Sequence, residues 1–508
     1  GREPGGAAPE SGTRGPGAMT APESRVERRT VRRGLRSRRV AVLAAVGVLL
    51  VAAVAAGDRS VTIGTGAVAA GASGPEVPGA RSMPSAWYCV AGTASPKGRT
   101  PETLVMANLG ARPARVEVTV MPGGDARPVS TALSIAGRSE RRLAVADVAP
   151  VESPGVVVEA FGGPVVVEHR LSAGNDSAAG PCARDAGTTW YTSGGTTVEG
   201  ASLWLEVFNP FPDDALVDVA LYTADGVKER DDLSGLSVPA RSRITVPLHE
   251  KVLDSDRVGA VVRARLGRVV VEQVLRTAAP YPRPGLTLSL GLRGTATRWY
   301  LPAGSGGRDD SETLAVLNPS DTEVPVRITT HLDSGQFLQP DEVTVDGRSL
   351  ALVDLRSRVP AGIGFWVTVD SRRPVVVESV LGRAGATGTA GLAAMPGLAR
   401  PTDRWVVGSG RTREESGDRL SVANPGRRSV RLTLRAVGEG RSRVIVGSGR
   451  PVSVGPGKRV VIDLVAAKVP VDAAVVVEAT GPVVVAHGAG TAPGVTRQGA
   501  LPFPPRPG

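Results

Sequence analysis

The chain has 508 residues, too many for one hydrophobic core, and its 64 Gly, 41 Pro and 3% aromatic residues are typical of a β-rich globular protein. The net charge of +11 invites a nucleic-acid-binding interpretation, but residues 1–39 alone, with ten Arg and four Glu, carry +6 of it. A nearly balanced remainder with few aromatics for base stacking argues against that class, and we expect no nucleic-acid partner.

The N-terminal part predicts export. Residues 1–39 form an Arg-rich arm that we expect to be disordered and cytoplasmic, with Met19 a candidate for the true start. Residues 40–57 are 18 uncharged residues without Pro, nearly enough for a helix across a bilayer core of roughly 30 Å. Arginines before such a segment orient a single-pass anchor with the rest of the chain outside. A secreted protein is the alternative, because Ala-Val-Ala at 53–55 fits signal cleavage.

The two cysteines of the chain, Cys89 and Cys182, lie beyond a Gly/Ala/Pro tether at residues 58–84. In an oxidising compartment two cysteines most simply form one disulfide, which is what we expect here. Two separate buried thiols are the alternative.

The remaining chain repeats one unit four times. Each copy opens with a tryptophan, and these follow one another at intervals of 103, 109 and 106 residues: Trp87, Trp190, Trp299 and Trp405. Each then has a short apolar stretch that ends at an asparagine: Asn108, Asn209, Asn318 and Asn424. Alternating apolar and polar residues follow, which is typical of half-buried strands. The copies span 85–183, 187–290, 296–396 and 402–490, and a Pro-rich tail covers 491–508.

This pattern predicts the fold. Six to eight short strands in about 106 residues are typical of a β-sandwich, so we expect an all-β chain of four tandem Ig-like sandwiches joined as a string. The alternative is a closed radial array similar to a propeller, although propeller blades have periods of about 40–50 residues. Each copy ends in two valine-rich runs, such as VVVEAFGGPVVVEH, and we expect these to form a buried hairpin.

The repeated pattern WY…NP…PVVVE resembles a repeat of exported proteins from high-GC actinobacteria, in a membrane-anchored family of unknown function. The resemblance covers about residues 85–490, and copy four departs from it at Val406 and Ala486. It implies topology and location, and it implies no activity.

The glutamates after the last valine run, Glu168, Glu272 and Glu378, recur in three copies. They are either catalytic or binding carboxylates, or the points where a buried strand reaches solvent. Copy four has Ala486 in this place, and an unpaired carboxylate in the interior would be costly. We therefore interpret the row as solvated strand ends.

The aromatic residues suggest two roles. The four repeated tryptophans are expected to be core residues, with sugar platforms as the alternative. The neighbouring Tyr88, Tyr191 and Tyr300 point to the opposite face and are the candidate exposed binding aromatics, together with Trp204 and Trp366. Each Asn at a strand end is expected to form an Asx-turn.

Catalytic chemistry is sparse in the sequence. The four histidines, at 169, 249, 331 and 487, lack the spacing of a zinc site, and we expect no metal or cofactor. The acidic group Asp309, Asp310 and Glu312 fits a solvated loop better than a calcium site. We therefore expect a non-catalytic extracytoplasmic scaffold of the cell envelope. The alternatives are a carbohydrate-binding protein of the cell wall and a hydrolase with its site in one divergent copy.

Overall fold

Strands make up most of the described chain, which confirms the all-β prediction. The computed structural model describes residues 74–79, 84–95, 98–383, 390–408, 415–447, 452–491 and 494–504. The predicted arm and the apolar segment at residues 40–57 lie outside these ranges. Within them, no helix combines the length and apolar character needed to cross a membrane.

The strands form four successive pairs of antiparallel sheets, which we call units 1 to 4. In unit 1 the sheets have the orders β1-β6-β3-β4 and β5-β2-β7-β8. The elements of unit 1 are β1 (Ser85–Cys89), β2 (Glu102–Asn108), β3 (Ala114–Met121), β4 (Val129–Ile135), β5 (Ser139–Ala144), η1 (Val145–Asp147), β6 (Gly155–Phe161), β7 (Val165–Ala173) and β8 (Asp176–Pro181).

Unit 2 repeats this arrangement, with the orders β12-β11-β15-β9 and β14-β10-β16-β17. Its elements are β9 (Thr189–Gly195), β10 (Ala201–Asn209), β11 (Ala215–Thr223), β12 (Gly226–Lys228), η2 (Asp231–Leu233), β13 (Leu236–Val238), β14 (Ser242–Pro247), α2 (Leu248–Lys251), β15 (Val258–Leu266), β16 (Val270–Thr277) and β17 (Gly285–Leu290).

Units 3 and 4 have the same sheets, but one long strand passes through both sheets of each unit. Unit 3 consists of β18 (Ala296–Gly304), β19 (Ser311–Asn318), β20 (Val324–Leu332), β21 (Asp341–Val345), β22 (Ser349–Asp354), β23 (Phe365–Arg383) and β24 (Gly391–Pro396). Unit 4 consists of β25 (Thr402–Val407), β26 (Glu415–Ala423), β27 (Val430–Gly438), β28 (Arg441–Val446), β29 (Val452–Val454), β30 (Arg459–Asp463), β31 (Ala474–Thr491), β32 (Gly494–Gly499) and β33 (Leu501–Pro502).

The prediction of a valine hairpin is wrong. In unit 1 the first run, β6, pairs with β1 and β3, whereas the second run, β7, pairs with β2 and β8 in the other sheet. The chain therefore crosses between sheets where a turn was expected. Each run is a central strand of its own sheet, which explains why valines occupy both of its faces.

One hydrophobic core lies between the two sheets of each unit, and the repeated tryptophans lie in it, as expected, with at most 1% of their surface exposed. Each indole Nε1 donates to the carbonyl that opens the second valine run, for example Trp87 to Val165 at 3.1 Å and Trp190 to Val269 at 2.7 Å. The buried polar end of each indole is thereby satisfied.

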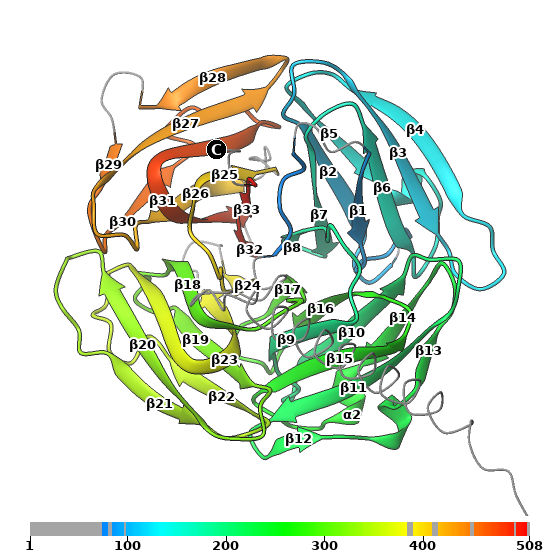
Figure 1. Cartoon of the computed structure of the whole chain (residues 1–508), viewed down its shortest axis with the longest axis horizontal. Coiled ribbons are helices and arrows are strands. Elements are labelled where there is room, and N and C mark those ends of the chain that lie inside the picture. Colours follow the sequence, from blue (N-terminus) through cyan, green and yellow to red (C-terminus); the bar gives the residue numbers. More distant parts are fainter. Residues whose placement is uncertain are drawn as a thin grey trace, which may run out of the picture. The chain divides into compact units, whose positions relative to one another are not determined.

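The units do not form a string, as the sequence suggested, but close into a ring. The innermost strands contact one another in the order β8, β17, β24, β32, and β32 contacts β8 again (Figure 1). The arrangement is radial, as in the alternative prediction, but each member of the ring is a pair of sheets. A cavity of about 60 Å³ lies among these strands.

Two predicted boundaries are wrong. The expected Pro-rich tail at 491–508 contains β32 and β33, so the chain returns to the ring after β31. Within the expected tether, Val77 is buried in the core of unit 1 and its N–H donates to the carbonyl of Pro502 at 2.9 Å.

Candidate functional site at the interfaces between units

The asparagines end their strands as the sequence predicts. The Oδ1 of Asn108 accepts from the N–H of Gly110 at 2.9 Å, and Asn209, Asn318 and Asn424 make the same contact two residues on. The side-chain N–H groups donate to carbonyls of the following turns, as from Asn108 to Arg112 at 2.8 Å. These side chains are buried and fully used in shaping turns, which leaves them no binding role.

The tyrosine row is not exposed, and this prediction is wrong. Tyr88 of unit 1 packs against the core of unit 2, and Tyr191 of unit 2 packs against the core of unit 3. Tyr300 of unit 3 is 8% exposed and lies in the core of unit 4, while Val406 of unit 4 takes the same part against unit 1. The face opposite the tryptophans is therefore the interface with the next unit.

The glutamate row is also not solvated, and this prediction is wrong. Glu168, Glu272 and Glu378 are each at most 2% exposed. Each carboxylate accepts hydrogen bonds from backbone N–H groups of the preceding unit in the ring. The shortest are from Ala91 to Glu272 at 2.6 Å, from Gly194 to Glu378 at 2.7 Å and from Gly408 to Glu168 at 2.6 Å.

A polar side chain of the preceding unit completes each carboxylate site. Gln498 Nε2 donates to Glu168 at 2.8 Å, and the hydroxyl of Ser289 donates to Glu378. Burial raises the pKa of Glu378, and the hydrogen bonds from Ser289 and the backbone oppose this rise. A buried carboxylate with these donors is stable, whereas it would be costly alone.

Interface 1–2, between units 1 and 2, contains a buried histidine between two carboxylates. His169 Nδ1 lies 2.8 Å from Glu102 Oε1, and its Nε2 lies 3.3 Å from Glu272 Oε1. Burial lowers the pKa of His169, but the charges and hydrogen bonds of Glu272 and Glu102 outweigh burial and raise this pKa to about 10. The imidazolium therefore persists at neutral pH and joins the two units.

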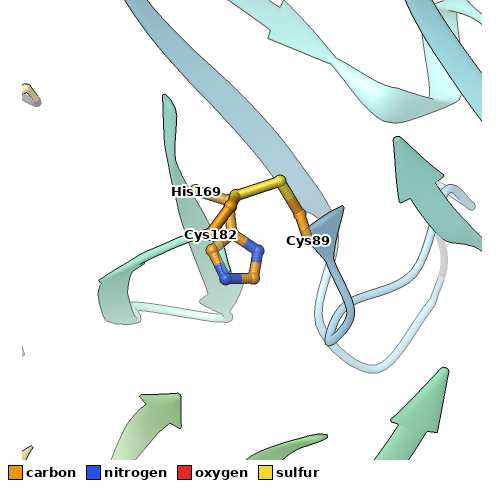
Figure 2. Close-up of side chains that lie close together, drawn as sticks. All are labelled: Cys89, His169 and Cys182. Carbon is orange, nitrogen blue, oxygen red and sulfur yellow. A yellow bond between two sulfur atoms is a disulfide. The ribbon is translucent and has the colours of Figure 1, made fainter. Parts of the chain in front are cut away.

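Cys89 and Cys182 form a disulfide beside this histidine. Figure 2 shows the His169 ring next to the two sulfur atoms, and the three potential ligand atoms lie within 4.8 Å of one another. Cysteines bind a metal ion as thiolates, and here the two sulfurs are bonded to each other, while the ring nitrogens face carboxylates. The oxidised cluster therefore fits a structural role.

Interface 3–4, between units 3 and 4, lacks the glutamate. Ala486 replaces it and packs with Met395, which stands at the position of Ser289 in unit 2, within one apolar cluster. The next layer holds a buried ion pair, from Arg497 Nη1 to Glu312 Oε1 at 2.6 Å. Glu312 is 2% exposed and Asp310 is 9% exposed, so the prediction of a solvated acidic loop is wrong for these two residues.

An arginine clamps the same two interfaces. Arg243 Nη1 donates to the carbonyls of Val90 and Gly92 at 2.6 and 2.7 Å. At interface 3–4, Arg459 Nη1 makes the equivalent bonds to Pro302 and Gly304 at 3.2 and 2.9 Å. Arg459 also forms a bidentate pair with Asp333, at 3.0 and 2.6 Å. Interfaces 1–2 and 3–4 thus share one architecture.

Beyond this shared frame, interface 3–4 opens into a cleft of about 600 Å³. We call it the arginine cleft, because four arginines and one aspartate are the charged residues among its lining: Arg383, Arg419, Arg459, Arg497 and Asp333. Arg419 is exposed and forms no ion pair with the described residues. Arg383 Nε lies 3.8 Å from Asp310 Oδ2, a loose contact.

The same space at interface 1–2 is filled by apolar side chains. The strand registers place Ala173 where unit 3 has Arg383, Leu288 where unit 4 has Arg497, and Trp204 where unit 4 has Arg419. Ala173, Leu288 and Trp204 belong to one cluster with Leu171 and Leu286. Interface 1–2 is therefore closed at the position where interface 3–4 is open.

Of the other two candidate aromatics, Trp366 is buried, whereas Trp204 stays partly exposed. Trp366 is 1% exposed, stacks on His331 with ring centres 4.1 Å apart, and donates to the Gly457 carbonyl at 3.1 Å. Trp204 is half-buried, and the Arg99 guanidinium lies over its ring at 4.8 Å. Both side chains take part in contacts between units.

The arginines of the cleft were missed in the sequence. They come from four different strands or strand ends, and apart from Arg459, which corresponds to Arg243, they do not recur among the copies. One signal was available for Arg459, since Arg243 stands 34 residues after Asn209 and Arg459 stands 35 residues after Asn424. The others become a cluster only when units 3 and 4 meet.

Comparisons with known proteins leave the activity open. Residues 166–279 match a family of unknown function, DUF5719, over a stretch that runs from β7 to the end of β16 and contains Glu168 and Glu272. Comparison with curated proteins gives no match. Among solved structures, a tetra-tandem repeat in the extending region of a large adhesion protein is 13% identical, with 82% of this chain and 99% of that chain covered and a TM-score of 0.09.

Proposed function

We propose that this chain is a non-catalytic extracytoplasmic protein of the cell envelope, in which four Ig-like sandwiches form a rigid scaffold that presents one polar cleft. The observation that carries the proposal is that the buried acid and base groups contact one another within the fold. Glu102, His169 and Glu272 join units, and His487 Nε2 lies 2.5 Å from the buried Asp418. General acid–base catalysis needs such groups within reach of a substrate, and burial denies that reach.

The location rests on two features. The disulfide between Cys89 and Cys182 is the kind of bond that persists outside the cytoplasm. The apolar segment 40–57 behind an Arg-rich arm supports export, with a single-pass anchor as our first choice and secretion as the second. On this view all four units lie outside the membrane.

The location is tested with the full chain in intact host cells, tagged at the C-terminus. Externally added protease should remove the tag, and a fully protected tag contradicts the proposal. Sequencing the N-terminus of the mature protein then separates the two forms. A chain that begins near Ala56 is cleaved and secreted, whereas an intact arm shows an anchor.

The absence of catalysis is tested by incubating the full chain with isolated cell-wall polymers. We expect no release of soluble fragments or new reducing ends. Release that persists in a variant such as His487→Gln, and is lost in a variant of the cleft, would instead show a hydrolase.

A further inference from the structure

We propose that the arginine cleft binds a small polyol that carries a carboxylate or phosphate group, such as an acidic sugar unit. The inference deepens the proposed scaffold function by giving it a ligand class, and it rests on the accessibility of the cleft rather than on the cellular location. Four observations carry it: charge, replacement of apolar residues, a buried unpaired donor, and the chemistry of the walls.

The charges in the cleft do not cancel locally. Arg459 is neutralised by Asp333, and Arg497 by Glu312. Arg383 is paired only loosely, with Asp310 at 3.8 Å, and Arg419 has no acidic partner among the described residues. Burial lowers the pKa of the Arg383 guanidinium; Asp310 opposes this, and the positive charges of Arg419 and Arg497 lower the pKa further. An anion between these groups would relieve the repulsion.

The arginines occupy positions where the same fold packs apolar side chains. At interface 1–2 the equivalent residues, Ala173, Leu288 and Trp204, close the space with a hydrophobic cluster. Arg497 also bonds across the interface, to Ala303 and Glu312 of unit 3. Arg383 and Arg419 form no hydrogen bond with the other unit among the described residues, and the clamp of Arg459 joins the units without them, as the clamp of Arg243 does at interface 1–2. Clustered cations without a structural need indicate a binding site.

One buried donor of a residue that lines the cleft has no acceptor. Arg497 is 4% exposed, and its Nη groups donate to Ala303, Glu312 and Ser379. Its Nε finds no hydrogen-bond partner in the described part of the chain. An unsatisfied buried N–H is costly, and a ligand oxygen is the kind of group that would satisfy it.

The walls favour a small, hydroxyl-bearing ligand. A volume of about 600 Å³ lies in the range of about 300–1,000 Å³ typical of small-molecule sites. Gly304, Gly306, Gly364, Gly417 and Gly490 line the cleft, and residues without side chains let a ligand approach the backbone closely. The described lining residues include no aromatic ring, so recognition here is polar rather than by stacking. Guanidinium groups bind carboxylate and phosphate in a planar, bidentate way.

The test is isothermal titration of the full chain with glucuronate, glucose 6-phosphate, inorganic phosphate and glucose. We expect at least one of the two acidic sugars to bind, and glucose to bind at least tenfold more weakly. The two acids distinguish a carboxylate from a phosphate ligand, and inorganic phosphate shows whether the sugar part contributes. Binding of glucose as tight as that of the acids, or no binding of either acid, would overturn the inference.

Arg383→Gln and Arg419→Gln should each weaken the binding of the preferred acid at least tenfold. The matched control is Arg431→Gln, because Arg431 is an exposed arginine of β27 in unit 4 that does not line the cleft. Equal weakening in all three variants would show diffuse charge attraction and contradict a site. Binding in solution does not depend on export, so a failure here leaves the envelope location standing, and the reverse also holds.

Discussion

Interfaces 1–2 and 3–4 share the same arginine and tyrosine contacts between units, but the space beside these contacts is filled at interface 1–2 and open at interface 3–4. In both, an arginine of the later unit grips two carbonyls of the earlier one, and a repeated tyrosine packs into the next core. Interface 1–2 then adds a carboxylate and a histidine and closes with an apolar cluster. Interface 3–4 has Ala486 in place of the carboxylate and leaves an arginine-lined cleft. The comparison indicates that the shared contacts hold the units together, whereas the residues beside them can differ and form a binding site.

The largest expected effect is at the carboxylate of interface 1–2. Glu272→Ala removes the acceptor of the Ala91 N–H and one of the two carboxylates at His169. Loss of one partner of a buried ion pair typically costs about 3–5 kcal/mol, so the melting temperature of the full chain should fall by several degrees. Glu199→Ala, at an exposed glutamate of the same unit, is the control. Equal melting temperatures for the two variants would contradict a structural role of the buried carboxylate.

Opening interface 1–2 should cost less. Trp204→Arg places an arginine where unit 4 has Arg419 and removes an aromatic ring that packs on the apolar cluster. A half-buried tryptophan lost from such a cluster should cost about 2–3 kcal/mol, below the range for fully buried ones. Thermal unfolding measures this loss. An unchanged melting temperature would show that the cluster is not needed to hold units 1 and 2 together.

Alkaline pH should loosen interface 1–2 selectively. The pKa of His169 is about 10 in the folded chain, above the ordinary value near 6.5, so its stabilisation is complete below about pH 6.5 and is lost as the pH rises through 10. Burial also raises the pKa of Glu102, with His169 opposing, and a raised carboxyl pKa acts in the same direction. Interface 3–4 relies instead on the ion pair between Arg497 and Glu312 and has no histidine between two carboxylates among the described residues.

The melting temperature of the full chain should therefore fall by a few degrees between pH 7 and pH 10. In His169→Gln this slope should be smaller, although the variant is less stable at pH 7. A slope as steep as that of the unaltered chain would assign the pH dependence to other groups.

The smallest effect is expected in the cleft itself. Arg419→Gln removes an exposed cation with no acidic partner among the described residues, so the free energy of unfolding should change by less than about 0.5 kcal/mol. Chemical denaturation of the two chains measures it. A loss above about 1 kcal/mol would mean that Arg419 supports the fold, which would weaken the case for a site.

The sequence was sufficient for what happens inside one unit. Period-two alternation located the strands, the repeated Trp87 position marked the core, and Asn108 and its equivalents marked strand ends. These signals depend on neighbours within about 100 residues of chain. The hydrogen bonds that these residues make lie within their own unit.

The sequence does not reveal the contacts that depend on two units meeting. It indicates a solvated Glu168 because the donors to this carboxylate, Gly408 and Gln498, lie in another copy. It indicates an exposed Tyr88 because the surface that covers this side chain belongs to unit 2. Copy four did carry a signal, since Val406 and Ala486 depart from the pattern, and each now lies at an interface where the neighbours differ.

The cleft forms from residues that are far apart in the sequence and belong to two different units. Arg383 ends β23 and Arg419 lies in β26, and only the ring places them together across interface 3–4. Side chains that do not recur among repeats give no periodic signal. Their role therefore emerges from charge and burial in the folded chain rather than from spacing.

The most direct test gives interface 3–4 the residue that occupies the corresponding position at interface 1–2. Arg419→Trp gives interface 3–4 the residue that stands at this position in interface 1–2, where Trp204 packs on the apolar cluster. Titration of this variant with the acid that the unaltered chain prefers should show at least a tenfold loss of binding, with the melting temperature unchanged or raised. Unchanged binding of the acid in a folded Arg419→Trp variant would contradict the claim that the open cleft is the functional site.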